Sequence, residues 1–179
     1  DRGDLLVIAG LGAPAWDATA AGDHPLTLPL WGAMGGAVMI GLGLALARPE
    51  RRVLVLTGDG EMLMGLGSLA TVAVQRPANL AIVVLDNERY GETGMQATHT
   101  AHGVDLAAAA AATGFEIAGT IRDQTTLETA LPDILGAPGP TFHTIKVGAD
   151  EHPLVLPPKD GASLKDRFRR ALLGEQALG

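Results

Sequence analysis

Two oxygen-bearing side chains stand where two apolar segments of the chain end. Asp59 follows the run 53–57 within Gly58-Asp59-Gly60, and Asn87 comes twenty-eight residues later, just after the run 80–85. Each run is short, uncharged and rich in leucine or β-branched residues, which is typical of a buried strand in a parallel sheet. The carboxyl ends of such strands share the edge where ligands bind. A carboxylate and a carboxamide suit Mg²⁺, which also accepts phosphate oxygens. The sequence therefore predicts a metal-bound diphosphate.

The residues around these two ligands fit a diphosphate. Gly58 and Gly60 permit positive φ and a close approach of backbone N–H groups to a phosphate, and the helix expected next would direct its N-terminus at the same anion. The side chain of Glu61 is expected to be solvated or paired nearby, because a diphosphate would repel it. The backbone candidates for binding the diphosphate are Gly60, Glu61, Tyr90 and Gly91, with Gly12 and Ala13 after the first strand.

Strand-like and helix-like segments alternate along the chain. We expect strands over 5–8, 53–57, 80–85, 115–118 and 141–147, and helices over about 33–47, 62–75, 106–113 and 125–135. This alternation predicts an α/β fold, a doubly wound parallel sheet with helices on both faces. Residues 1–179 are expected to form a single domain, since the length suits one core and no linker or repeat is visible.

A final amphipathic helix is expected over residues 163–173. Ser163 and Asp166 stand at the spacing of a capping box, and Leu164, Phe168 and Leu172 share one face. The basic residues of this segment are expected to form a solvated face; they are Lys165, Arg167, Arg169 and Arg170.

The composition excludes several classes of protein. The net charge of −7 and the 3% aromatic content argue against nucleic acid as a partner. The chain has no cysteine, which excludes disulfides and thiolate sites and fits a cytoplasmic location. Residues 24–47 carry no formal charge and could by length cross a bilayer. Pro25, Pro29 and several glycines interrupt this stretch, so we expect an extended segment and a buried helix, with no membrane as partner.

The metal motif resembles that of a known family. Gly58-Asp59-Gly60, 25 further residues and then Asp86-Asn87 look like the thiamine diphosphate motif of the thiamine-dependent enzymes. The resemblance implies the thiamine diphosphate-binding fold, with thiamine diphosphate and Mg²⁺ as cofactors. It implies that the side chains of Asp59 and Asn87 and the backbone carbonyl of Arg89 bind the metal. The family often has Asn-Asn where this chain has Asp86-Asn87, but the second residue is the ligand.

The segment Trp31-Gly32-Ala33-Met34-Gly35 also resembles an element of this family. In the family, a carbonyl and a bulky apolar side chain hold the cofactor bent, so that its aminopyrimidine can take a proton from the thiazolium. By position, Gly32 would offer the carbonyl and Met34 the wedge. Taken alone, Met34 is equally a flexible side chain that fills a gap in the core.

The resemblance also implies a missing component. In the family, an essential glutamate comes from a separate pyrimidine-binding domain, normally across a subunit interface. The segment before Gly58 is too short to be that domain. We therefore expect a pyrimidine-binding (α) subunit as the partner in an α/β hetero-oligomer, and no catalysis by this chain alone. It would be a small subunit or the carboxyl-terminal piece of a longer protein.

The segment Thr93-Gly94-Met95-Gln96-Ala97-Thr98-His99 looks like a stretch of the phosphonopyruvate and sulfopyruvate decarboxylases. The sulfopyruvate enzymes match better, because their two halves commonly occur as separate chains of about this size. The resemblance implies decarboxylation of a small anionic 2-oxo acid, for which the chain must supply donors. The candidates are His99 first, as a substrate or acid–base residue, and then His102, Gln96, Thr98 and Arg89.

Two alternatives stay open. A phosphonopyruvate decarboxylase or an acetolactate-synthase-like carboligase would share the metal motif. A non-catalytic nucleotide-binding or regulatory module is the alternative from another class. Gly10-Leu11-Gly12 and Gly41-Leu42-Gly43 are glycine pairs, but neither completes the dinucleotide-binding pattern.

Overall fold

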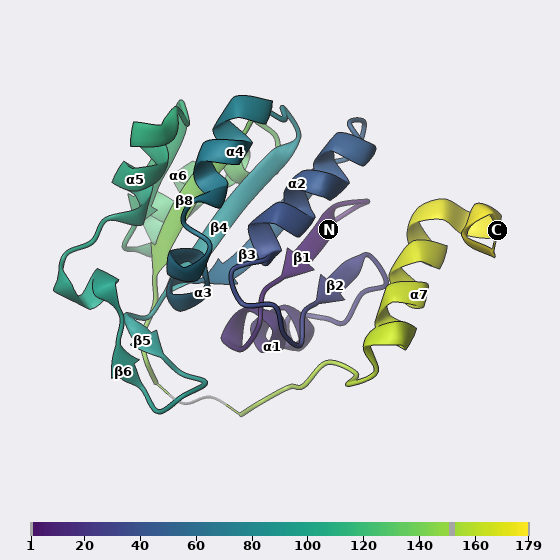
Figure 1. Cartoon of the computed structure of the whole chain (residues 1–179), viewed down its shortest axis with the longest axis horizontal. Coiled ribbons are helices and arrows are strands. Elements are labelled where there is room, and N and C mark those ends of the chain that lie inside the picture. Colours follow the sequence, from purple (N-terminus) through teal and green to yellow (C-terminus); the bar gives the residue numbers. More distant parts are fainter. Residues whose placement is uncertain (1, 151–152, 179) are drawn as a thin grey trace.

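Six parallel strands form the sheet around which the chain folds (Figure 1). The computed structural model describes residues 2–150 and 153–178. The strand order is β2-β1-β3-β4-β8-β7, and all five pairings are parallel. The strands are β1 (Leu6–Ala9), β2 (Thr27–Pro29), β3 (Val53–Gly58), β4 (Leu80–Asp86), β7 (Ile117–Ile121) and β8 (Thr141–Lys146). The sheet is doubly wound, as predicted. From β1 the chain passes to the edge strand β2 and returns to β3 and β4, and it then forms the other edge strand, β7, before β8 fills the place between β4 and β7.

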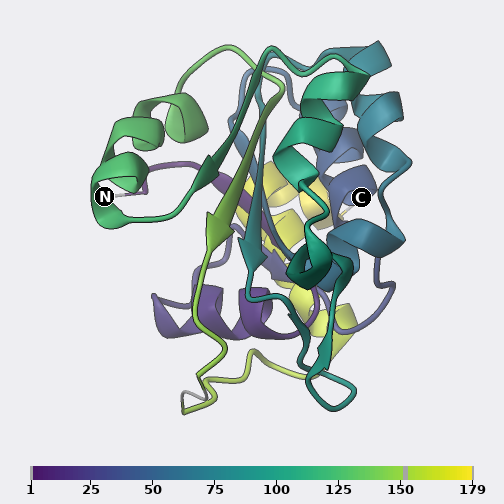
Figure 2. The same cartoon turned by 90° about the vertical axis from the view of Figure 1, so that its left-hand side faces the viewer.

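Helices cover both faces of this sheet, as Figure 2 shows from the side. One face carries α2 (Ala37–Ala47), α3 (Asp59–Met64), α4 (Ser68–Gln75) and α5 (Leu106–Thr113), and the other carries α1 (Ala13–Ala20) and α6 (Gln124–Leu135). The last helix, α7 (Gly161–Leu173), packs beside the edge strand β2. A short hairpin of β5 (Arg89–Tyr90) and β6 (Gln96–Ala97) and two 3-10 turns, His99–His102 and Gly174–Leu178, complete the elements.

The core is larger on the face that α2, α4 and α5 cover. Alternate residues of β3 belong to different layers: Val53 and Val55 are fully buried in the larger cluster, whereas Leu54 and Leu56 pack on the smaller one. Small residues bring the helices close to the strands. A Cβ added at Gly41 of α2 would lie 2.1 Å from Cγ2 of Val55. The abundance of alanine and glycine therefore reflects close helix–sheet packing.

The uncharged stretch 24–47 folds as an extended segment and a helix, as predicted. The extended part contains β2, and the helix is α2. Within the described ranges, no helix has the length and apolar character needed to cross a bilayer. The helix begins at Ala37, later than the predicted residue 33, because residues 31–36 form a turn.

The helix predicted over 62–75 is two helices, which is a correction. The first, α3, begins at Asp59 and ends at Met64. Residues 65–67 form a turn, and α4 begins at Ser68. Close contact of two backbones accounts for the break, because a Cβ on Gly65 would lie 2.3 Å from the carbonyl oxygen of Gly35. The turn formed by residues 31–36 therefore packs against the interruption between α3 and α4.

Two predictions about the last helix were wrong. Asp160, rather than Ser163, caps α7, because its carboxylate accepts hydrogen bonds from the backbone N–H groups of Ala162 and Ser163. The basic residues do not all face solvent, because the guanidinium of Arg167 is bound by both carboxylate oxygens of Asp23 at 2.6 and 2.9 Å. The other three, Lys165, Arg169 and Arg170, are exposed as expected.

Protonation of His143 should couple stability to pH. His143 lies on β8 with 5% of its surface exposed, and burial lowers the pKa of its imidazole, against a smaller opposing effect of Asp133. The unfolded chain therefore binds this proton more readily than the folded chain. It follows that the free energy of unfolding decreases as pH falls below the ordinary histidine pKa of 6.5.

We predict that His143→Leu flattens the decrease in the urea unfolding midpoint between about pH 7.5 and pH 5.5. Exposed His102 provides the control, and His102→Gln should keep the pH dependence of the wild type. The same slope in His143→Leu and the wild type would contradict this origin of the acid sensitivity.

Candidate functional site

The two predicted metal ligands follow neighbouring strands. In the register of β3 and β4, Gly58 lies opposite Leu85, so Asp59 and Asn87 both emerge at the carboxyl edge of the sheet. Figure 1 shows α3 and the β5–β6 hairpin at this same edge. The structure therefore brings together the two ends that the sequence pattern predicted.

Buried threonine hydroxyls hold the carboxylate of Asp59, of which only 2% is exposed. The hydroxyl of Thr98 donates to Oδ2 at 2.5 Å, and that of Thr100 lies 3.2 Å from the same oxygen. Both threonines are buried, at 0% and 6% exposure. The other carboxylate oxygen, Oδ1, receives neither of these bonds, so the two threonines fix the orientation of the carboxylate.

Asp86 links this group to a basic side chain. Thr100 Oγ1 lies 2.8 Å from Asp86 Oδ1 and 2.9 Å from Thr98 Oγ1. Because a hydroxyl has one proton, it donates to only one of these groups or to Asp59 at any moment. Lys146 Nζ lies 2.8 Å from Asp86 Oδ2 and 2.6 Å from Glu88 Oε1. Burial lowers the pKa of Lys146, but the bonds to these two carboxylates outweigh that effect and raise it. The lysine compensates Asp86, whereas no ion pair to Asp59 occurs among the described residues 2–150 and 153–178.

The charge on Asp59 is therefore unfavourable in the free chain. Burial raises the pKa of its carboxyl group, the hydrogen bond from Thr98 lowers it, and the neighbouring carboxylate of Asp86 raises it. A divalent cation beside Asp59 would reverse this balance. The observed environment thus fits a cation-binding carboxylate.

A tight turn fixes the orientation of the Asn87 side chain. Its Oδ1 accepts a hydrogen bond from the backbone N–H of Arg89 at 3.0 Å, and Asp86 Oδ1 accepts one from the N–H of Glu88 at 3.1 Å. Glu88 takes a left-handed conformation with φ of 61°. This conformation is uncommon for a residue other than glycine and is often found at functional sites. A carboxamide oxygen has two lone pairs, so Asn87 can still bind a metal.

No cluster of three or more histidine, aspartate or glutamate side chains suited to a metal occurs in the part of the chain that the structure describes. The predicted set contains one carboxylate, one carboxamide and one backbone carbonyl, and it does not need such a cluster. These donors are all oxygens, which is the set that Mg²⁺ accepts.

One expectation for the glycines beside Asp59, positive φ, was wrong. Gly58 is extended, with φ of −93°, and Gly60 lies within α3, so neither takes positive φ. Gly60 is instead required by Tyr90, because an added Cβ would lie 2.7 Å from two atoms of the tyrosine ring. This packing places the segment after Asn87 directly against the start of α3.

The turn 31–36 has an unusual backbone. Ala33 and Gly35 both have positive φ, at 57° and 90°. Met34 is half-buried and Gly32 is exposed. The indole N–H of Trp31 donates to the carbonyl oxygen of Pro158 at 2.8 Å. The turn therefore presents Gly32 and Met34 in a conformation that its neighbours must stabilise.

Glu61 is buried, which corrects one of the two expectations for its side chain. Only 3% of it is exposed, and Thr57 Oγ1 donates to Glu61 Oε2 at 2.9 Å. The backbone N–H of Ala37 donates to Oε1 at 3.4 Å. Burial raises the pKa of this carboxyl group, and these hydrogen bonds partly oppose the effect. Glu61 is paired nearby and is not solvated.

The candidate substrate residues separate into two groups. Thr98 cannot serve as predicted, because its buried hydroxyl is bound to Asp59. His99, His102 and Gln96 are exposed, and Arg89 is partly so. The loop after β1 does reach this edge, since a Cβ on Gly12 would lie 2.8 Å from Glu92 Oε1 in the hairpin. The threonines that support Asp59 were not identified as such, because their contacts are tertiary.

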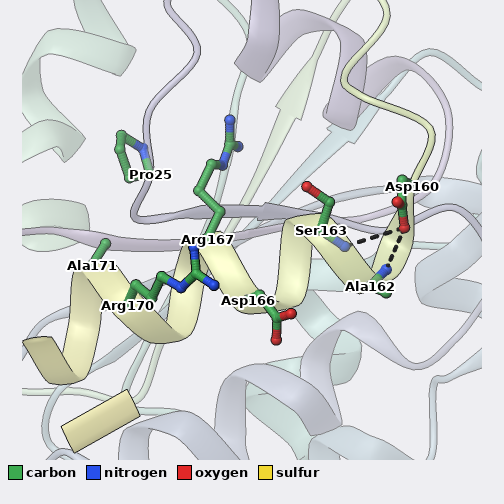
Figure 3. Close-up of a pocket in the computed structure, with 8 residues that line it drawn as sticks. All are labelled: Pro25, Asp160, Ala162, Ser163, Asp166, Arg167, Arg170 and Ala171. Atoms are coloured by element: carbon green, nitrogen blue, oxygen red, sulfur yellow. Dashed lines mark hydrogen bonds between the residues drawn. The ribbon is translucent and has the colours of Figure 1, made fainter. Parts of the chain in front are cut away.

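A hollow of about 780 Å³ lies beside α7 (Figure 3). Asp160, Asp166, Arg167 and Arg170 line it from the helix side, and Pro25 lines it from the segment before β2. None of its lining residues belongs to the carboxyl edge of the sheet. The hollow is therefore separate from Asp59 and Asn87.

Comparison with known proteins identifies the family. The model of the thiamine pyrophosphate enzyme C-terminal TPP-binding domain matches residues 15–145. The chain belongs to the thiamine pyrophosphate enzymes. This membership agrees with the resemblance seen in Gly58-Asp59-Gly60 and Asn87.

Three relatives show how this thiamine pyrophosphate domain occurs elsewhere. The chain is 40% identical over 171 residues to sulfopyruvate decarboxylase subunit beta of Methanothermobacter thermautotrophicus, covering 96% of this chain and 89% of that one. It is 48% identical over 111 residues to phosphonopyruvate decarboxylase of Streptomyces hygroscopicus, covering 62% of this chain but only 27% of the relative. An X-ray structure of a candidate thiamin diphosphate-dependent enzyme from Mycobacterium smegmatis aligns with a TM-score of 0.59 and 23% identity, over 87% of this chain and 29% of that one. The last likeness establishes the fold.

Removing the hydroxyl of Thr98 or Thr100 should destabilise this thiamine pyrophosphate domain even without cofactor. Thr98→Val and Thr100→Val each remove one hydroxyl donor from the buried carboxylates, and each is expected to lower the free energy of unfolding by roughly 1–3 kcal/mol in chemical denaturation. Thr93→Val is the matched control, because Thr93 is exposed and bonds only the exposed Gln96. Equal losses in all three variants would mean that the carboxylates do not depend on these hydroxyls.

Proposed function

We propose that this chain is the diphosphate-binding β subunit of a thiamine diphosphate- and Mg²⁺-dependent 2-oxo acid decarboxylase, acting on sulfopyruvate to give sulfoacetaldehyde and carbon dioxide. One observation carries the proposal: a buried, threonine-held Asp59 stands next to the Asn87 turn at the carboxyl edge of the sheet. It does so in a chain that aligns over 171 residues with a sulfopyruvate decarboxylase β subunit. In this proposal residues 1–179 form a single diphosphate-binding domain in the cytoplasm.

Each part of the edge has a proposed role. Asp59, Asn87 and the backbone carbonyl of Arg89 would bind Mg²⁺. The turn 31–36 would hold the bend of the cofactor through the Gly32 carbonyl and the Met34 side chain. The backbone groups proposed to bind the diphosphate are those of Gly58, Gly60, Glu61, Tyr90 and Gly91.

The chain and the cofactor would divide the work. Thiamine diphosphate supplies the electron acceptor that allows carbon dioxide to leave a 2-oxo acid. The Asp59 and Asn87 side chains would fix the metal and through it the diphosphate. His99, exposed between Thr98 and Thr100, is the proposed substrate or acid–base residue on this chain. The essential glutamate would come from the partner.

An exposed apolar surface supports the need for a partner. Helix α2 carries no charged residue, and its outer side exposes Met39, Ile40 and Leu46 by 37–50%. Next to it, Met64 is 57% exposed and Val74 of α4 is 78% exposed. Helices α2 and α4 lie side by side on one face of the sheet (Figure 1). Such a surface is typical of a protein interface, and we assign it to a pyrimidine-binding subunit.

The size of the relatives is consistent with this partner. The chain spans 89% of a relative whose name designates one subunit, but 27% of a phosphonopyruvate decarboxylase. The higher local identity to the latter, 48% over 111 residues, favours phosphonopyruvate as the second candidate substrate. Both candidates carry an acidic group on the carbon next to the keto group.

Turnover by the assembled enzyme tests the substrate. The chain, co-purified with its partner and supplied with thiamine diphosphate and Mg²⁺, is expected to release carbon dioxide and sulfoacetaldehyde from sulfopyruvate faster than it releases carbon dioxide from phosphonopyruvate. Asp59→Ala in the same assembly should lose cofactor retention and turnover. Acetolactate from pyruvate, with no sulfoacetaldehyde from sulfopyruvate, would reverse the assignment in favour of a carboligase.

A charge placed on the apolar surface tests the partner. Ile40→Asp and Met64→Asp should each reduce recovery of the partner in co-purification by about tenfold or more, because burying an unpaired carboxylate is costly. Leu135→Asp is the matched control, since Leu135 is 51% exposed on α6 at the opposite face. Unchanged recovery with Ile40→Asp and Met64→Asp would place the interface elsewhere.

A further inference from the structure

Four segments of the chain converge on the buried carboxylate of Glu61. The end of β3 contributes the hydroxyl of Thr57, 2.9 Å from Oε2. The start of α2 contributes the N–H of Ala37, 3.4 Å from Oε1. The backbone N–H groups of Gly35, in the turn 31–36, and of Leu11, in the loop after β1, lie near enough to lower the pKa of this carboxyl group. Glu61 itself belongs to α3, next to Asp59.

Backbone encloses this carboxylate closely. A Cβ on Gly10 would lie 1.9 Å from Glu61 Oε2, so only glycine leaves room for the carboxylate at that place. The groups described above as bonding it are a hydroxyl and backbone amides, which carry partial charges only. Keeping a carboxylate buried with such partners is unfavourable unless several donors act together. These donors are therefore held in position by the carboxylate of Glu61.

This contact pattern differs from ordinary helix capping. Glu61 lies in the first turn of α3, where a carboxylate could interact with its own helix. It reaches instead to Ala37, twenty-four residues earlier in the chain. The turn that it contacts contains Ala33 and Gly35, both with positive φ, so that turn needs an external acceptor to keep its conformation.

We propose that Glu61 is a positioning residue for the cofactor. Its carboxylate couples the turn that carries Gly32 and Met34 to α3, which carries Asp59. The part of the site assigned to the bend of the cofactor is thereby held at a fixed distance from the part assigned to the metal and diphosphate. This inference rests on the proposed function, and it adds a role for a side chain that neither touches the metal nor faces solvent.

Hydrogen–deuterium exchange on the free full-length chain gives the first test. Glu61→Gln keeps the size of the side chain but replaces one acceptor oxygen by a donor NH₂ group. The amides of Leu11, Gly35 and Ala37 should exchange about tenfold faster or more, whereas those of β8 and α5 stay unchanged. Glu92→Gln is the control, because it removes an equal charge from an exposed position in the nearby hairpin.

A second, milder variant keeps the test decisive if Glu61→Gln folds poorly. Thr57→Val removes one donor to Oε2 and leaves the carboxylate in place. It should accelerate exchange of the same three amides by a smaller factor. Wild-type exchange at Leu11, Gly35 and Ala37 in both variants would overturn the proposal.

Binding of two ligands separates positioning from general loss of structure. Trp31, adjacent to Gly32, can report binding by fluorescence in a Trp16→Phe background that leaves it as the remaining tryptophan. With saturating Mg²⁺, Glu61→Gln should raise the Kd for thiamine diphosphate about tenfold or more and change the Kd for inorganic pyrophosphate less than about twofold, because pyrophosphate needs only the metal half of the site.

The outcomes are distinguishable. An equal loss for thiamine diphosphate and pyrophosphate would mean that Glu61 only maintains the fold and would overturn its positioning role. Failure of the wild type to bind either ligand would contradict the proposed function instead, while the exchange result would still decide whether Glu61 holds the turn.

Discussion

The structure of the site depends on one interaction, the hydrogen bond from Thr98 to a carboxylate that the fold has removed from water. Asp59 lies close enough to Asp86 for a single hydroxyl, that of Thr100, to reach both. Lys146 contacts the Asp86 side of this pair. The Asp59 side has polar neighbours but no cationic one among the contacts described, and a bound cation is the simplest way to compensate a buried carboxylate. The environment of Asp59 thus supports the proposed cation, and the family membership supports thiamine diphosphate as the cofactor.

Close backbone contacts position the rest of the site around this carboxylate. Gly60 admits the ring of Tyr90, and Gly65 admits the carbonyl of Gly35. The first contact brings the segment after β4 onto α3, and the second brings the turn 31–36 onto the break between α3 and α4. Helix α3 is short, yet it carries both Asp59 and Glu61, and these two side chains form hydrogen bonds with different segments of the chain. Its two carboxylates therefore connect the part of the edge proposed to bind the metal with the turn that carries Met34.

The sequence predicted five of the six strands and the positions of Asp59 and Asn87, because two short uncharged runs ending in oxygen-bearing residues leave few alternatives in a parallel sheet. The sixth strand, β2, was expected only as an extended segment. Helix α5 has its predicted bounds because Asp105 caps it and left-handed Gly114 ends it. The supporting contacts were not predictable. Thr98 stood in a polar loop with no pattern to indicate burial, and the sequence left open whether the side chain of Glu61 is solvated or paired nearby. The hairpin has two residues in each strand, too few for any periodicity.

The central claim is that Asp59 and Asn87 bind one divalent cation that anchors a diphosphate. A crystal of the full assembly grown with thiamine diphosphate and Mn²⁺ tests it most directly, because Mn²⁺ takes the same oxygen ligands as Mg²⁺ and scatters anomalously. We expect a single strong anomalous peak within about 2.0–2.4 Å of Asp59 Oδ1 and Asn87 Oδ1, with phosphate oxygens completing the shell. A peak at any other place in the chain, with Asp59 still bonded only to Thr98 and Thr100, would contradict it.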